Sequence, residues 1–404
     1  GVARRWPLLT LLTVAYGLGA FGMLGVSPLT PSLVEGFRLS RFDVAFIVPC
    51  VYLPGLFFSL PAGHLGDRLG VRPTFLGGLA LAAAGLALAA AAPGFWLFLA
   101  CLIVAGTGWS VVNPVLGKAI VDLFPVRERG IAMGIKQMGL TVGGVISALV
   151  LPPIAAWLGW RAAVATCALV IAAPALSSWR PLAPLADPRP GHAASTQADD
   201  DAWWWIRRPA LLVFFATGIA LGMLQSAVLA YLPLYGVQVL GWSAVAAGAL
   251  VAAAQAGGAV ARLALGAASD RWLGGRRPPW VVLSSLLGAL VFGAYALAPA
   301  RSPLTAFTLA FVAGIGAHGW VGVYFIASAE AGGPRRAGLL SGVAFGVIVV
   351  GLLVGAPLFG AVLVSRDSYA AAWAVFAALA AIIAMVMAAA GEAIHRECAR
   401  AGGR

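Results

Sequence analysis

The stretch PAGHLGDRLGVRP (residues 61–73) lies between two apolar runs, and the chain carries a second version of it, ALGAASDRWLGGRRP (residues 264–278). Both copies hold an Asp-Arg pair among small residues, followed by an Arg-Pro pair. Each copy comes after the second apolar run of its half of the chain. Self-similarity at matched positions indicates two related halves.

Two further pairs of segments support the duplication. GAFGMLGVSPL (19–29) matches GIALGMLQSAVL (218–229), and RGIAMGIKQMGLTVGG (129–144) matches AGLLSGVAFGVIVVG (337–351). The second alignment pairs Gly134 with Gly342 and Gly143 with Gly351.

The composition indicates a membrane protein. Of 404 residues, 61% are hydrophobic and 10% charged, whereas soluble proteins carry about 25% charged residues. The apolar runs are long enough to cross a bilayer as helices and lack the alternation of a membrane barrel. Hydropathy and the Pro, Gly and charge breaks predict twelve spans: 8–33, 43–64, 73–92, 96–121, 130–156, 162–179, 209–235, 243–267, 279–299, 303–329, 338–364 and 370–391.

The basic residues orient these spans. With the N-terminus in the cytoplasm, eighteen Lys and Arg fall on the cytoplasmic side, five on the opposite side, and three inside spans. This asymmetry predicts that both termini are cytoplasmic. It also accounts for the net charge of +12, so the basic composition does not indicate a nucleic-acid partner. The four cysteines have no metal-binding spacing, and no cofactor is expected.

The predicted fold is therefore an all-α membrane protein, with twelve transmembrane helices in two pseudo-symmetric six-helix bundles. The expected parts are an N-terminal bundle (1–179), a cytoplasmic central loop (180–208), a C-terminal bundle (209–391) and a cytoplasmic tail (392–404).

Over almost its whole length the chain resembles the major facilitator superfamily of secondary transporters. The resemblance rests on Gly63-x-x-Gly66-Asp67-Arg68-x-Gly70-x-Arg72, which is similar to that family's loop motif after the second span, and on its second copy, Gly266-x-x-Ser269-Asp270-Arg271. An Asp beside Arg residues at a cytoplasmic helix end can form charge pairs and helix-terminal contacts. We therefore expect a conformational latch formed by Gly63, Asp67, Arg68, Arg72, Asp270 and Arg271.

Charges inside the spans are costly and indicate function. No carboxylate lies in the middle of a predicted span, which argues against a site for a cationic substrate. The cations there are Lys118, Lys136 and Arg262. Lys118 can pair with Asp122 at i,i+4. Lys136 and Arg262 have no acidic residue within a helical turn, and together they would attract an anion.

Each of these two cations has an alternative role. Lys136 can extend its amine to the cytoplasmic interface, and Arg262 can cap backbone carbonyls at a helix end. Val260-Ala261-Arg262-x-x-x-Gly266 is similar to the eighth span of the monocarboxylate transporters, where the resemblance implies that the arginine binds the substrate carboxylate. Those proteins carry an acidic residue one turn earlier, where this chain has Gly258.

The resemblance implies that the first, fourth, seventh and tenth spans line the transport cavity. The expected substrate-binding residues are Lys136, Arg262, Tyr16, Asn113, Gln137, Gln225, Tyr231, Trp320 and Tyr324. Because Lys136 and Gln137 diverge by about 100° around a helix, at most one points squarely into the cavity. His318 is the candidate proton carrier, with hydrogen bonding between helices as the alternative.

The function expected from the sequence is secondary transport of a small organic anion, with a monocarboxylate as the expected class, by rocker-switch alternating access. The runner-up is a multidrug or metabolite exporter of the same superfamily. That branch carries Gly-Pro-x-x-Gly-Gly in the fifth span and an arginine in the fourth, where this chain has GLTVGG (139–144) and Leu102. A membrane enzyme is not expected, since the spans hold no set of catalytic residues.

The expected setting is a bacterial inner membrane. The expected partners are the anionic substrate, protons if transport is proton-coupled, and lipid, with a monomer as the working form. Proton symport, anion exchange and uniport remain open, as do the substrate's identity and the direction of transport.

Overall fold

The structure is a computed structural model that describes residues 5–185, 204–272, 276–300 and 302–402. Within these ranges, the side chains outside the description are those at 59–64, 67, 126–127, 130, 263, 265–272, 334–335, 399 and 401–402. Every regular element in the described residues is helical, as predicted.

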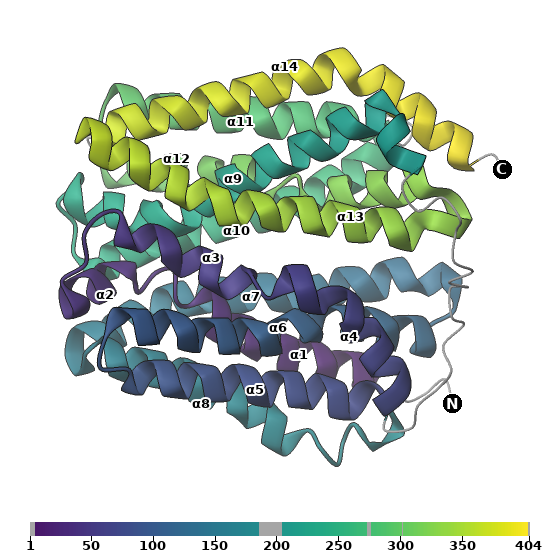
Figure 1. Ribbon diagram of the computed structural model, residues 1–404, viewed down its shortest axis with the longest axis horizontal. Helices are drawn as coiled ribbons and strands as arrows, with labels where there is room; N and C mark the ends of the chain where they lie inside the picture. Colours follow the sequence, from purple (N-terminus) through teal and green to yellow (C-terminus); the bar gives the residue numbers. More distant parts are fainter. Residues whose placement is uncertain (1–4, 186–203, 273–275, 301, 403–404) are drawn as a thin grey trace. The chain divides into compact units, whose positions relative to one another are not determined.

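The chain forms two compact units (Figure 1). The first holds the elements α1 to α8 together with residues 236–252. Its elements are α1 (Arg5–Leu24), α2 (Thr30–Phe37), η2 (Asp43–Phe46), α3 (Ile47–Tyr52), α4 (Gly55–Leu69), α5 (Val71–Ala91), α6 (Phe95–Leu123), α7 (Val126–Leu158), α8 (Trp160–Ser177) and η3 (Ala183–Leu185).

The second unit holds the remaining elements, apart from residues 236–252, which span the end of α9 and the start of α10. These elements are η4 (Trp204–Arg207), α9 (Pro209–Gln238), α10 (Ala244–Trp272), α11 (Pro278–Leu297), α12 (Pro303–His318), α13 (Val321–Arg366) and α14 (Tyr369–Gly402). The predicted tail is therefore helical as far as Gly402, while most of the predicted central loop lies outside the described residues.

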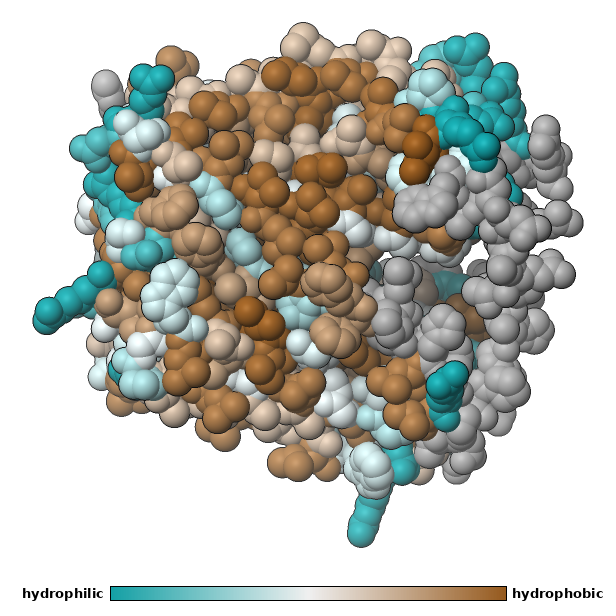
Figure 2. Space-filling model, viewed as in Figure 1, coloured by the Kyte–Doolittle hydropathy of each residue, from teal (hydrophilic) through white to brown (hydrophobic). Residues whose placement is uncertain are grey.

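Eleven helices of the described chain are long and apolar enough to cross a membrane. In Figure 2, apolar side chains cover most of the visible helix surface, and hydrophilic ones gather toward helix ends. Together these features fit the prediction of twelve transmembrane helices, of which the second is made of shorter helices.

Three predicted spans are not single regular helices. The second is divided into η2, α3 and α4, where Pro49 and Pro54 lack the N–H that a continuous helix needs. The first ends at Leu24, and α2 begins only at Thr30, after a turn containing Pro28. The tenth is interrupted between α12 and α13 at Gly319 and Trp320.

Two glycines act as turning points. Gly70 ends α4 and immediately precedes α5, with φ of 90° and ψ of 160°, a conformation that side-chain-bearing residues avoid. This explains the last glycine of the loop motif. Gly333, with φ of 61°, breaks α13 between the tenth and eleventh predicted spans.

The first and fifth predicted spans of the first unit, α1 and α7, meet backbone to backbone at glycines. A methyl group added at Gly143 would clash with the carbonyl oxygen of Gly17, and one added at Gly139 would lie 2.5 Å from that of Thr13. In lipid, helices associate through van der Waals contact and hydrogen bonds, and small residues permit this close approach. We call this contact the α1–α7 seam.

The second unit repeats the arrangement between α9 and α13. A methyl group at Gly351 would clash with the carbonyl of Ile219, and one at Gly222 with that of Ile348. Gly143 and Gly351, aligned by the sequence repeat, therefore perform the same packing role in their respective units.

We expect Gly143→Ala and Gly351→Ala each to lower the free energy of unfolding by about 1–3 kcal/mol, because each forces two backbones apart. The measurement is unfolding of purified protein in detergent. Gly134→Ala and Gly346→Ala are matched controls on the same helices, since no atom lies within 4 Å of an added methyl group. Equal stability of the seam variants and their controls would contradict the assigned packing.

Candidate functional site

The α1–α7 seam places Lys136 inside the first unit. Lys136 lies one turn before Gly139 on α7, and Tyr16 precedes Gly17 on α1. The close approach of the two helices therefore brings both side chains together, with the ammonium 5.4 Å from the centroid of the Tyr16 ring. This distance is within the range of a cation–π contact.

The hydrogen-bond partner of Lys136 is an amide oxygen. Its Nζ donates to Oδ1 of Asn113 on α6 at 2.6 Å, and the Tyr16 hydroxyl donates to the same oxygen at 3.5 Å. Lys136 is only 6% exposed, so it does not extend to water at the interface. Among the described residues, no carboxylate lies within ion-pair distance of it.

Two of the candidate binding residues named from the sequence, Asn113 and Tyr16, contact this lysine. The Tyr16 ring stacks on Trp109 with centroids 5.3 Å apart, and Asn113 is exposed. Gln137 is half-buried, and in the described structure its Oε1 is buried without a hydrogen-bond partner. We define the lysine site as Lys136, Asn113, Tyr16 and Trp109.

Lys118 behaves differently from Lys136. Its ammonium pairs with the Asp122 carboxylate at 3.1 Å, which confirms the predicted i,i+4 pair. The chain's two lysines thus offer a direct comparison, one with a carboxylate partner and one without.

In the second unit, Arg262 caps a helix end. Its Nε donates to the carbonyl of His318 at 3.0 Å, at the point where α12 stops and the tenth predicted span is interrupted. A side chain that donates a hydrogen bond to a helix carbonyl is a common cause of such a break. The Nδ1 of His318 is buried and has no hydrogen-bond partner in the described structure.

Steric packing explains why position 258 is a glycine. A methyl group there would lie 2.6 Å from Cβ of His318. An acidic side chain of the monocarboxylate-transporter pattern would therefore displace His318. The close packing of α10 on α12 explains this departure from that pattern.

The expected aromatic binding residues of the second unit are buried in packing contacts. The Trp320 indole donates to the carbonyl of Ala317 at 2.9 Å, and the Tyr324 hydroxyl donates to that of Phe214 at 3.0 Å. Tyr231 stacks on Phe359, and Gln225 is half-buried on α9. None of these three aromatic side chains is exposed.

The expected latch is described only in part. Arg68 is exposed at the end of α4, and the Arg72 guanidinium lies 4.1 Å from the ring centroid of Trp179, a contact that the sequence does not indicate. The surroundings of Gly63, Asp67, Asp270 and Arg271 lie outside the described structure. The latch therefore remains a prediction.

Comparison with known proteins identifies the family of this chain. The Major Facilitator Superfamily profile matches residues 12–356, and the chain belongs to this family. It is similar to an uncharacterized MFS-type transporter of Mycobacterium tuberculosis, with 28% identity over 382 residues, which are 93% of this chain and 82% of that protein.

This chain is also similar to one protein over part of its sequence and to another over its whole fold. The hexuronate transporter of Escherichia coli is 28% identical over 165 residues, which are 38% of this chain and 34% of that protein. The fold matches the crystal structure of a bacterial homologue of the human lysosomal transporter Spinster, in an inward-facing and occupied conformation. That match has a TM-score of 0.76 and 17% identity, over 98% of this chain and 97% of the other. The protein is thus a multi-pass membrane transporter.

We expect Lys136→Met to leave the unfolding temperature unchanged or to raise it, because a buried charge without a carboxylate partner opposes folding. Lys118→Met is the matched control and should lower that temperature, since it leaves Asp122 without its partner. Thermal unfolding in detergent measures both. A larger loss for Lys136→Met than for Lys118→Met would mean that Lys136 serves the fold.

Proposed function

We propose that this protein is a secondary active transporter of a small organic anion, with a monocarboxylate as the expected class, working by rocker-switch alternating access. The observation that carries the proposal is the lysine site. Its ammonium is buried, bonded to an amide oxygen, and has no carboxylate partner in the described structure.

The energetic argument is that an unneutralised cation at membrane depth costs about 2.5–3.5 kcal/mol on insertion scales. Asn113 and the Tyr16 ring offset part of this cost but bring no negative charge. A bound carboxylate would supply that charge, and charge-assisted hydrogen bonds are the strong ones. The site is thus suited to an anion and repels a cation.

The similarity to a hexuronate transporter supports the anionic class, since a hexuronate is a sugar carboxylate. Within the proposal, Arg262 is a second contact for the substrate carboxylate. One of its nitrogens bonds to the His318 carbonyl, which would fix the orientation of the guanidinium plane. His318 is the proposed coupling residue if transport is proton-linked.

We place the protein in a bacterial inner membrane with both termini in the cytoplasm. The excess of Lys and Arg on that side supports this orientation.

The test is uptake of radiolabelled lactate and glucuronate into proteoliposomes, normalised to folded protein. Lys136→Ala should reduce uptake at low substrate concentration about tenfold or more, the loss expected for a charge-assisted hydrogen bond. Arg262→Ala should also reduce uptake. Arg366→Ala removes an exposed cation at the end of α13 and should leave uptake unchanged. Full uptake of both acids by Lys136→Ala and Arg262→Ala would overturn the proposal.

A further inference from the structure

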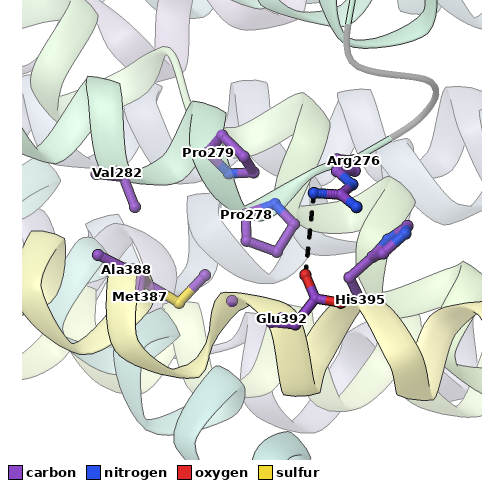
Figure 3. A pocket seen from close by; sticks show the side chains of 9 residues that line it. Arg276, Pro278, Pro279, Val282, Met387, Ala388, Glu392 and His395 are labelled. Atoms are coloured by element: carbon purple, nitrogen blue, oxygen red, sulfur yellow. Dashed lines mark ion pairs between the residues drawn. The ribbon is translucent and has the colours of Figure 1, made fainter.

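A crevice lies in the second unit, between the start of α11 and the last turns of α14, whereas the lysine site belongs to the first unit. Its volume is about 350 Å³, and it is lined by Arg276, Pro278, Pro279, Val282, Met387, Ala388, Gly391, Glu392 and His395. Figure 3 shows Val282, Met387 and Ala388 at one end, and Arg276, Glu392 and His395 at the other. The crevice is therefore amphipathic along its length.

The walls of the crevice continue the exposed apolar faces of both helices. On α11, Leu283, Leu286 and Leu290 are exposed, and Pro279 lies one turn before Leu283 on the same face. On α14, Ile382 and Met385 are exposed. In a membrane-spanning helix such faces meet lipid. An occupant of the crevice would thus be continuous with the bilayer.

The polar end favours an anion. Arg276 and His395 lie there beside one carboxylate, Glu392. The Arg276–Glu392 pair is loose at 3.9 Å, with side chains 55% and 61% exposed, so it contributes little to stability and can exchange for another anion. The N-terminal end of α11, which begins at Pro278, adds the positive end of a helix dipole.

We propose that this crevice binds an anionic phospholipid. The head-group phosphate lies between Arg276 and His395, and the first methylene groups pack on Val282, Met387 and Ala388. The volume fits a head group with the start of its chains, while the remaining chain lies along the exposed faces of α11 and α14. The site is independent of the transported substrate.

The test is a titration of delipidated full-length protein with phosphatidylglycerol, followed by native mass spectrometry, with phosphatidylcholine as the uncharged comparison. Arg276→Gln should weaken the first phosphatidylglycerol adduct on the order of fivefold, the contribution of one basic residue near a membrane surface. Glu392→Gln should strengthen it, because it removes the competing carboxylate. Arg396→Gln is the matched control, since Arg396 lies on α14 but does not line the crevice.

Preferential binding of phosphatidylglycerol with these opposite effects would support the site. Three results would overturn it: equal adducts with both lipids, equal weakening by Arg276→Gln and Arg396→Gln, or weaker binding by Glu392→Gln. Soluble glycerol 3-phosphate should not displace the adduct, and displacement would mean that the crevice takes a water-soluble anion instead.

Discussion

The close contact of two helix backbones at glycines is the constraint on which each unit depends. A bilayer gives no hydrophobic force to press one apolar helix against another, so contact must come from shape. Gly17, Gly139 and Gly143 let α1 and α7 touch, and Gly222 and Gly351 do the same for α9 and α13. The same contact serves function in the first unit, because it places Lys136 beside Tyr16.

The symmetry of the two units ends at the lysine site. The same sequence alignment that pairs Gly143 with Gly351 pairs Lys136 with Ala344 and Gln137 with Phe345. The shared packing therefore does not require a charge at this depth. In the second unit the cation is Arg262, on a different helix, and it bonds to the carbonyl at the end of α12. Lys136 and Arg262 thus have different hydrogen-bond partners, an amide oxygen for the lysine and a helix carbonyl for the arginine.

The sequence predicts much of the fold because its signals are local or repeated: apolar runs, the duplicated motif and the Lys118–Asp122 spacing. It does not predict the division of the second span, where two prolines interrupt an apolar run. The sequence also does not predict the contacts between helices. How the helices pack determines three contacts: the bond of Lys136 to Asn113, the packing of Arg72 on Trp179 and the close approach of Gly258 to His318. Of the two roles that the sequence suggests for Arg262, the structure contains the helix-capping bond to the His318 carbonyl. The contact with substrate is a proposal.

The central claim is that the buried ammonium of Lys136 binds an anion. A thermal-shift screen of purified protein against carboxylates, inorganic anions and cationic drugs tests it most directly. The account predicts that a small carboxylate raises the unfolding temperature of the wild-type protein and has no effect on Lys136→Met. Stabilisation by cationic drugs alone, or equal stabilisation of both proteins by the carboxylate, would contradict it.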